Sequence, residues 1–230
     1  MKYDFPETLS GDTTLHNIEL DKAVIKFLKE HSTRSVTVIN GAMASGKTHF
    51  LIKLLENFDD YLVFKPGSIY GYSPTLKSRS GFTHSCVYNL TDFIQNPIFY
   101  EAEYLQLKTG RCSLIAVDEF QFATPEEIEF IFSWKIEVVL SGLRTDYLGR
   151  EFPVWKQIEE KYNPIKINIS SRCECGNPTQ YNIRFVNGSV DLRGMGYLNP
   201  LEDPYLIVPE VSHYKSVCKS CFERFVTWST

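Results

Sequence analysis

The chain lacks several features that would place it in a specialised class of protein. It has no apolar run of the roughly 18 residues needed to cross a bilayer. It also has no stretch of basic residues of the kind that coats nucleic acid by neutralising phosphates. Its start, MKYDFPETLS, lacks a basic segment followed by an apolar one, so we expect no secretory signal. These absences favour a cytoplasmic protein without a membrane or nucleic acid as partner.

The composition is that of an ordinary folded protein. Of the 230 residues, 43% are hydrophobic and 23% are charged, and 24 Lys+Arg against 28 Asp+Glu give a formal net charge of −4. The 16 Phe and 13 Tyr exclude a disordered chain, because such chains are poor in aromatic residues. This length can accommodate one large domain with a smaller appendage, and it is sufficient to bury a sizeable core.

Strands and helices are predicted to alternate through the first 170 residues. Short apolar or β-branched runs predict strands at 35–40, 61–65, 113–117 and 137–140. Apolar residues at helical spacing predict helices at 20–31, 48–58, 99–108 and 155–162, and a capping box at Thr124 to Glu127 begins another. This alternation is typical of an α/β fold with a mainly parallel sheet. Residues 66–90 show no periodicity and are expected to form a long loop.

The pattern changes after about residue 170 to short strands, turns and cysteine pairs, with one further helix expected at 221–227. We therefore divide the chain into three parts. They are a loose N-terminal extension (1–18), an α/β nucleotide-binding domain (19–170) and a small C-terminal module (171–230).

A phosphate-binding motif occupies residues 41–48, where GAMASGKT matches G-x-x-x-x-G-K-[ST] in full. It stands between a predicted strand and a predicted amphipathic helix, as in P-loop NTPases. Its glycines allow backbone N–H groups to surround a polyphosphate at the positive end of the following helix. Lys47 would reach the β- and γ-phosphates, and the Thr48 hydroxyl would ligate Mg²⁺. The expected ATP-binding residues of this loop are Gly41, Ser45, Gly46, Lys47 and Thr48.

Two acidic residues, Asp118 and Glu119, directly follow the predicted strand 113–117. In P-loop proteins an acidic residue at this place holds Mg²⁺, and we assign that role to Asp118. Glu119 is then free to act as general base on a substrate hydroxyl. The alternative is a pair of solvated acids at the end of a strand.

Four of the six cysteines form two close pairs. Cys173 and Cys175 make a C-x-C, and Cys218 and Cys221 make a C-x-x-C. In a reducing compartment such pairs more often hold metal than form disulfides. Four thiolates would complete a tetrahedral structural zinc site with no open position for catalysis. The alternative is a set of unpaired structural or redox cysteines.

These motifs together resemble the zinc-containing, cellular-type (type II) thymidine kinases. GAMASGKT is similar to the family's G-P-M-F-S-G-K-[ST], residues 117–122 to D-E-x-Q-F, and residues 142–152 to G-L-D-x-D-F-x-G-x-P-F. Residues 78–81 resemble S-R-x-G, residues 214–221 resemble Y-x-x-x-C-R-x-C, and Arg184 stands where the family has T-x-R. Each match beyond the P-loop is weak by itself, whereas several in the same order are specific.

The resemblance implies an enzyme that transfers the γ-phosphoryl group of ATP to the 5′-hydroxyl of thymidine or a related pyrimidine deoxynucleoside. It implies Mg²⁺ with the ATP, a structural zinc ion, and a homo-oligomer that is a tetramer or a dimer. Glu119 would be the catalytic base, Gln121 and Arg79 would lie beside ATP, and a zinc-anchored lasso (176–217) would close the site. The implied nucleoside-binding residues are Met43, Tyr147, Phe152, Arg184 and Tyr214.

The chain departs from the family pattern at several positions. Asn182 replaces the Thr of T-x-R, Arg144 replaces the acid of G-L-D, and Pro209-Glu210 replaces paired glycines. These changes motivate a second hypothesis: a zinc-stapled nucleotide-binding protein that hydrolyses ATP or switches while its C-terminal module grips nucleic acid or a protein. The negative net charge and the lack of a basic stripe near the cysteines favour the kinase.

Overall fold

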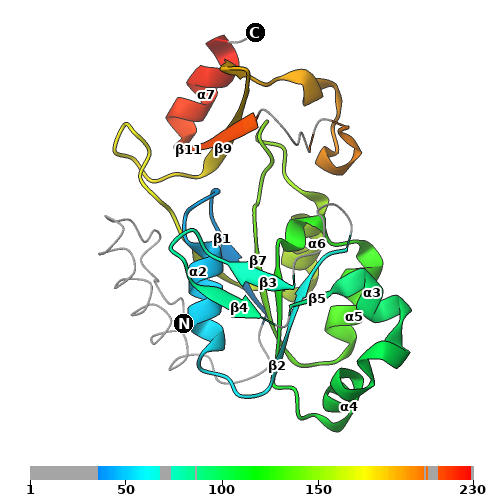
Figure 1. The fold of residues 1–230 in the computed structure, drawn as a ribbon. Helices are drawn as coiled ribbons and strands as arrows, with labels where there is room; N and C mark the ends of the chain where they lie inside the picture. Colours follow the sequence, from blue (N-terminus) through cyan, green and yellow to red (C-terminus); the bar gives the residue numbers. More distant parts are fainter. Residues whose placement is uncertain (1–35, 68–73, 86, 205, 207–211, 229–230) are drawn as a thin grey trace.

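A computed structural model describes residues 36–67, 74–85, 87–204, 206 and 212–228. The expected extension 1–18 and the predicted helix 20–31 lie outside these residues. Figure 1 shows a larger α/β part and a smaller part, containing β9, β11 and α7, beyond one end of it. In the described part of the chain, the helices are too short or too polar to cross a bilayer.

A six-stranded sheet forms the centre of the larger part, in the order β5-β2-β6-β7-β1-β8. Every neighbouring pair in this sheet is parallel, which confirms the predicted α/β fold. The strands are β1 (Val36–Asn40), β2 (Tyr61–Lys65), β5 (Val87–Asn89), β6 (Leu114–Asp118), β7 (Glu137–Gly142) and β8 (Ile165–Asn168). β6 is buried at all five positions, as expected for a strand covered on both faces.

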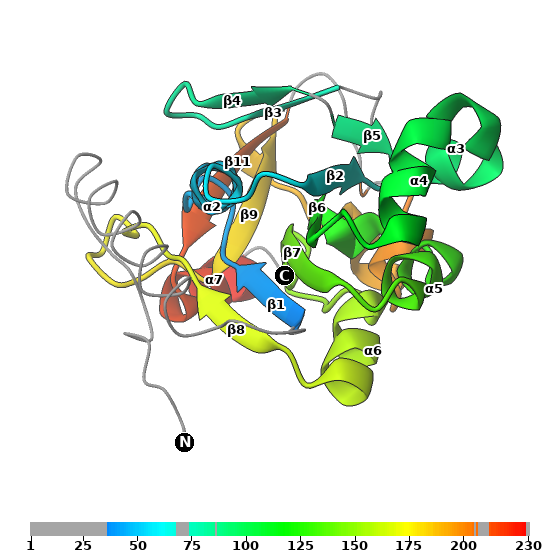
Figure 2. The same ribbon diagram turned by 90° about the horizontal axis from the view of Figure 1, so that it is seen from below.

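Helices cover both faces of this sheet (Figure 2). α2 (Lys47–Leu55) lies on one face. The helices on the other face are α3 (Leu90–Gln95), α4 (Glu101–Thr109), α5 (Pro125–Ser133) and α6 (Pro153–Tyr162). The predicted capping box of α5 is confirmed, because the Thr124 hydroxyl accepts from the backbone N–H of Glu127 and the Glu127 carboxylate accepts from that of Thr124.

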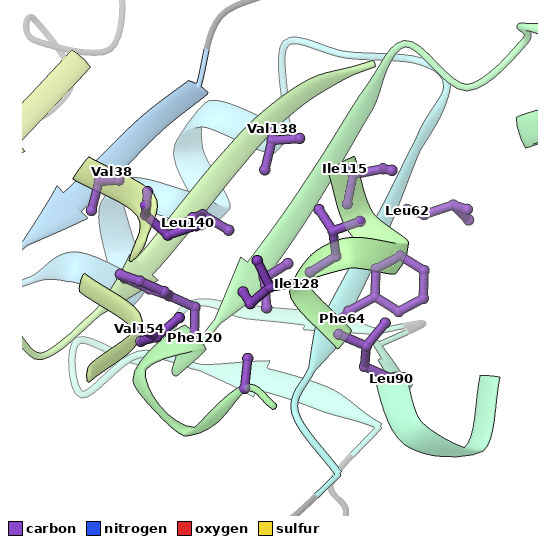
Figure 3. Close-up of a cluster of buried hydrophobic side chains, with 14 of the residues drawn as sticks. Val38, Leu62, Phe64, Leu90, Ile115, Phe120, Ile128, Val138, Leu140 and Val154 are labelled. Carbon is purple, nitrogen blue, oxygen red and sulfur yellow. The ribbon is translucent and has the colours of Figure 1, made fainter. Parts of the chain in front are cut away.

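Two hydrophobic clusters sandwich the sheet, because successive side chains of a strand point to opposite faces. Val38 belongs to the cluster beneath α5 and α6, whereas its neighbour Ile39 belongs to the cluster beneath α2. Figure 3 shows the first cluster, in which Phe64, Ile128 and Leu140 come from three different elements. The strand ends that carry the motifs therefore stand on a packed core.

Residues 66–90 contain short elements where the sequence predicts a single loop. β3 (Thr75–Lys77) and β4 (Thr83–Ser85) form an antiparallel hairpin, and β5 and the start of α3 follow it. The hairpin contacts α2, since Ser80 Oγ lies 2.9 Å from His49 Nδ1. Strands of three residues are too short to show a periodicity, which is why the sequence did not reveal them.

The smaller part is built on an antiparallel sheet in the order β10-β9-β11. Its elements are β9 (Tyr181–Val186), β10 (Ser189–Val190), β11 (Ser212–Val217) and α7 (Lys219–Trp228). Short 3₁₀ turns occur at Pro97–Tyr100, Phe120–Phe122, Arg193–Gly196 and Pro200–Glu202. The change from parallel to antiparallel pairing falls between β8 and β9, near the domain boundary predicted at residue 170, which stays a prediction.

Candidate active site

The motifs meet at the carboxyl-terminal edge of the parallel sheet. The P-loop follows β1 and the acidic pair follows β6, and the register places Asp118 beside Ser141 and Asn40 beside Gly142. In open α/β sheets, ligands bind outside this edge. The small antiparallel sheet lies beyond the same edge in Figure 1, so it forms the opposite side of the site.

The two glycines of the P-loop occupy positions where a side chain would be strained or would clash. Gly46, directly before α2, has φ of 105°, a left-handed conformation that favours glycine. A Cβ atom at Gly41 would lie 2.1 Å from the carbonyl oxygen of Ile169. The hydroxyl of Ser45 is buried and has no hydrogen-bond partner among the described residues. An unpaired buried hydroxyl costs free energy, so this group is suited to a ligand that completes its hydrogen bonding.

Lys47 is held inside the loop, with 8% of its surface exposed. Its Nζ donates to the carbonyl oxygens of Gly41 (3.0 Å) and Ala42 (2.9 Å). Burial lowers the pKa of Lys47 below its usual value. A bound polyphosphate would supply the negative charge that favours the protonated amine.

Three other charged groups act on this lysine. The carboxylates of Glu119 and Asp118 raise the pKa of Lys47, while the guanidinium of Arg79 lowers it. Arg79 is exposed, in the turn between β3 and β4. The structure thus brings Lys47, Asp118, Glu119 and Arg79 within electrostatic range of one another.

The two acids have different environments. Asp118 is 4% exposed and its Oδ1 accepts a hydrogen bond of 2.9 Å from Ser141 Oγ. Burial and the neighbouring charge of Glu119 raise the pKa of Asp118 to about 6. Glu119 is half-buried, in a left-handed conformation with φ of 57°.

Gln121 holds the Glu119 carboxylate in place. Its Nε2 donates to Glu119 Oε2 at 2.6 Å, and its Oε1 accepts from the backbone N–H of Leu143 at 3.0 Å. Gln121 is fully buried, and a Cβ atom at Gly142 would lie 2.3 Å from its Oε1. The resemblance implies that Gln121 lies beside ATP, which stays a prediction; in the structure its side chain contacts Glu119 and the backbone of Leu143.

Three of the predicted nucleoside-binding residues are connected. The guanidinium carbon of Arg184 lies 3.5 Å from the centroid of the Tyr147 ring, and Arg184 Nη1 donates to the Tyr214 hydroxyl at 3.5 Å. Burial raises the pKa of Tyr147, whose hydroxyl donates to Asp203 Oδ2 at 3.0 Å. Phe152 is 1% exposed and belongs to the hydrophobic cluster that includes residues of α6, and its contact with the nucleoside stays a prediction.

Sequence reasoning missed the ionic groups around these residues. Arg150 pairs with both Asp146 and Asp203, and it donates to the carbonyl oxygens of Gly194 and Tyr197 at 2.6 Å each. Arg150 thereby joins the loop after β7 to the predicted lasso. Asp146 and Arg150 lie within the motif matched at 142–152, but the motif does not indicate their pairing with each other, and Asp203 is 53 residues from Arg150 in the chain, so its pairing leaves no local signal.

Asp191 is a second missed partner, because Arg184 Nε donates to its Oδ2 at 2.9 Å and Arg193 Nε donates to its Oδ1 at 2.8 Å. The contacts of Met43 were missed as well. Its backbone N–H donates to Asn182 Oδ1 at 2.7 Å, and its carbonyl oxygen accepts from Ser216 Oγ at 2.5 Å.

The four cysteines predicted as ligands come together. The sulfur atoms of Cys173, Cys175, Cys218 and Cys221 all lie within 4.8 Å of one another, so the group could hold a metal ion. Tetrahedral zinc with Zn–S bonds of about 2.3 Å places sulfur atoms about 3.8 Å apart, which this cluster fits. Burial tends to raise the pKa of Cys173, but backbone hydrogen bonds from Cys175 and Cys218 lower it to about 7.

A family model described as thymidine kinase matches residues 34–222, from before the P-loop to beyond the last cysteine. The chain belongs to the thymidine kinase family. A relative named thymidine kinase from Legionella pneumophila (strain Lens) is 29% identical over 186 residues, covering 76% of this chain and 86% of the relative. Another from Francisella tularensis subsp. tularensis is 28% identical over 196 residues, covering 80% and 94%.

Likeness to solved structures is weaker. The large terminase of a thermophilic bacteriophage aligns with a TM-score of 0.38 and 8% identity, over 66% of this chain and 45% of that chain. A score this low says nothing further about the fold or the activity, and membership of the thymidine kinase family rests on the sequence match.

Proposed function

We propose that this protein transfers the γ-phosphoryl group of ATP to the 5′-hydroxyl of thymidine or a related pyrimidine deoxynucleoside. The observation that carries the proposal is the meeting of P-loop, Lys47 and acidic pair at one sheet edge in a chain of the thymidine kinase family. The family match spans both the P-loop and the cysteines, and it favours the kinase over an ATPase that grips nucleic acid.

The phosphate end of the site positions ATP. The backbone of the P-loop and the Lys47 ammonium group bind the β- and γ-phosphates. A phosphate oxygen also accepts a hydrogen bond from the Ser45 hydroxyl, which has no partner among the described residues. Thr48 and Asp118 would hold Mg²⁺, which neutralises phosphate charge when it is bound with ATP. Arg79 adds a further positive charge. Positioning and electrostatics dominate the catalysis of phosphoryl transfer.

Glu119 is the general base of this scheme. Its carboxylate accepts the proton of the 5′-hydroxyl as that oxygen bonds to the γ-phosphorus, and the bond from the γ-phosphorus to the bridging oxygen breaks to release ADP. Gln121 fixes one carboxylate oxygen, which leaves the other oxygen for the substrate.

The nucleoside would bind between the two parts of the protein. The side chains proposed to contact it are Met43, Tyr147, Phe152, Arg184 and Tyr214, of which Tyr147, Arg184 and Tyr214 are joined to one another by the contacts described above. Apolar and aromatic surfaces suit the two faces of a pyrimidine ring.

The cysteine cluster would hold a zinc ion of architectural role, anchoring the turn at 173–176 to the start of α7. We further propose a homo-oligomer in the cytoplasm.

A radiolabelled phosphate-transfer assay tests the function. The wild-type protein should convert thymidine to its monophosphate, and Glu119→Gln should lower kcat by about 10²- to 10⁴-fold while Mg·ATP still binds. Glu129→Gln, an exposed acid of α5, is the matched control and should leave kcat unchanged. An unchanged kcat in Glu119→Gln would remove this residue from the role.

A thermal-shift panel separates the two hypotheses. Stabilisation by thymidine supports the kinase, whereas stabilisation only by ATP together with an oligonucleotide supports the alternative.

A further inference from the structure

Two side chains of the small antiparallel sheet hold one peptide of the phosphate-binding loop. Asn182 on β9 and Ser216 on β11 are direct cross-strand partners. Asn182 Oδ1 accepts from the backbone N–H of Met43 at 2.7 Å, and Ser216 Oγ donates to the carbonyl oxygen of Met43 at 2.5 Å. Both backbone groups of Met43 are therefore bound by side chains more than a hundred residues away in the chain.

The two side chains also support each other. Ser216 Oγ lies 3.3 Å from Asn182 Oδ1, and Asn182 is 2% exposed. Because Met43 N–H can only donate, the Asn182 amide must present its oxygen to it, which fixes the orientation of the side chain. The result is a small closed network between Met43, Asn182 and Ser216.

Strand alternation places this network on the site side of the small sheet. Asn182 and Arg184 point to the same face of β9, toward Met43 and Tyr147, whereas Ile183 points to the other face and packs with Phe222 of α7. The polar face of β9 and β11 is thus turned toward the P-loop.

We propose that Asn182 and Ser216 are positioning residues for the nucleotide, because they hold the first half of the P-loop in its binding conformation. The chain between β1 and Gly46 has no regular structure, and Ala44 within it adopts a left-handed conformation with φ of 59°. A loop that is ordered before binding loses less conformational entropy when phosphate enters. This inference rests on the proposed function for the identity of the nucleotide.

Substitutions test the hydrogen bonds rather than the bulk of the side chains. Asn182→Leu removes the acceptor for Met43 N–H at similar side-chain volume and without adding charge. Ser216→Ala removes the donor, whereas Ser216→Thr keeps the hydroxyl. Ser189→Ala, an exposed serine of the same sheet, is the matched control.

The measurement is the Kd of the non-hydrolysable analogue Mg·AMP-PNP, by isothermal titration calorimetry on the full chain. Asn182→Leu and Ser216→Ala should weaken binding by about 5- to 20-fold, the effect of one lost hydrogen bond. Ser216→Thr and Ser189→Ala should stay within about 3-fold of wild type. In steady-state kinetics the KM for ATP should rise with kcat retained, because Glu119 is untouched.

The outcomes separate this inference from the proposed function. Equal Kd values for all variants, with tight binding by the wild type, would overturn the positioning role and leave the kinase intact. Equal weakening by Ser216→Ala and Ser216→Thr would also overturn it. A wild type that does not bind Mg·AMP-PNP would overturn both proposals. If Asn182→Leu does not fold, the Ser216 pair decides alone.

Discussion

The guanidinium carbon of Arg184 lies 3.5 Å from the centroid of the Tyr147 ring, which joins β9 to the loop after β7. Arg184 is fully buried and Tyr147 is 4% exposed. The tyrosine hydroxyl donates to Asp203, and the arginine forms an ion pair of 2.8 Å with Asp191. A desolvated cation over an aromatic ring interacts strongly. This contact links the α/β part to the cysteine-bearing part across the proposed nucleoside site.

Arg184→Met should destabilise the protein by about 3 to 5 kcal/mol, because it removes one member of a buried ion pair. Arg184→Lys should recover only part of this loss, since lysine lacks the planar group that contacts the ring and the carboxylate together. Urea denaturation measures the free energy of unfolding. Arg224→Met, an exposed arginine of α7, should change it by less than about 0.5 kcal/mol. If Arg184→Met changes the free energy of unfolding as little as Arg224→Met does, the contact between Arg184 and Tyr147 is not important for stability.

The stability of the protein should fall in acid through Asp191. Burial tends to raise the pKa of Asp191, but the hydrogen bonds from Arg193 and the charge of Arg184 outweigh it and lower the pKa to about 2. A carboxyl group with a folded pKa below its unfolded value of about 3.9 stabilises the protein above that pH, and the contribution is lost as the pH falls toward 2.

Thermal denaturation at several pH values between about 5 and 2 checks this expectation. At the upper end of that interval Asp191→Asn should have a lower Tm than the wild type. Its Tm should then fall by less than that of the wild type as the pH is lowered. Parallel curves for the two proteins would contradict it.

Asp118→Asn should stabilise the nucleotide-free protein while abolishing phosphoryl transfer. The pKa of Asp118 is raised to about 6, so the folded protein carries an unfavourable buried charge above that pH. The destabilisation is absent below the unfolded pKa of about 3.9, grows as the pH rises, and is complete above the folded value. At pH 8 the gain in unfolding free energy should be about 1 to 3 kcal/mol.

Chemical denaturation at about pH 8 and pH 5 without nucleotide tests this, and the gain should be smaller at the lower pH. If Asp118→Asn changes the unfolding free energy equally at both pH values, or lowers it, the ionised Asp118 carboxylate does not destabilise the nucleotide-free protein.

The cysteine cluster should bind one zinc ion per chain. Removal of the metal by a chelator, or Cys218→Ser, should lower the Tm and eliminate the metal, because a closed four-thiolate site contributes directly to folding. Cys112→Ser is the matched control and should leave the metal content unchanged. Cys112 is buried in the α/β core, where its thiol donates to a backbone carbonyl, so it lies outside the cluster. Elemental analysis measures the metal content. Full zinc in Cys218→Ser would contradict the assignment.

Features with a local cause could be predicted from the sequence. The capping box at Thr124 depends on residues three apart, and strands such as Leu114–Asp118 follow from continuous apolar runs. The hairpin at 75–85 was missed because its strands have three residues each. The resemblance predicts Phe152 beside the nucleoside, which stays a prediction, and its burial in the hydrophobic cluster next to α6 is a feature that no motif encodes.

The sequence by itself determined the P-loop, the acidic strand end and the two close cysteine pairs, because each depends on residue types at short, fixed spacing. Only the tertiary structure decided that Asn182 and Ser216 hold Met43, that Arg184 covers Tyr147, and that the Tyr147 hydroxyl donates to Asp203. The physical reason is that these contacts join residues far apart in the chain. Their free energy comes from burial and pairing that exist only after the small sheet has docked at the edge of the large one.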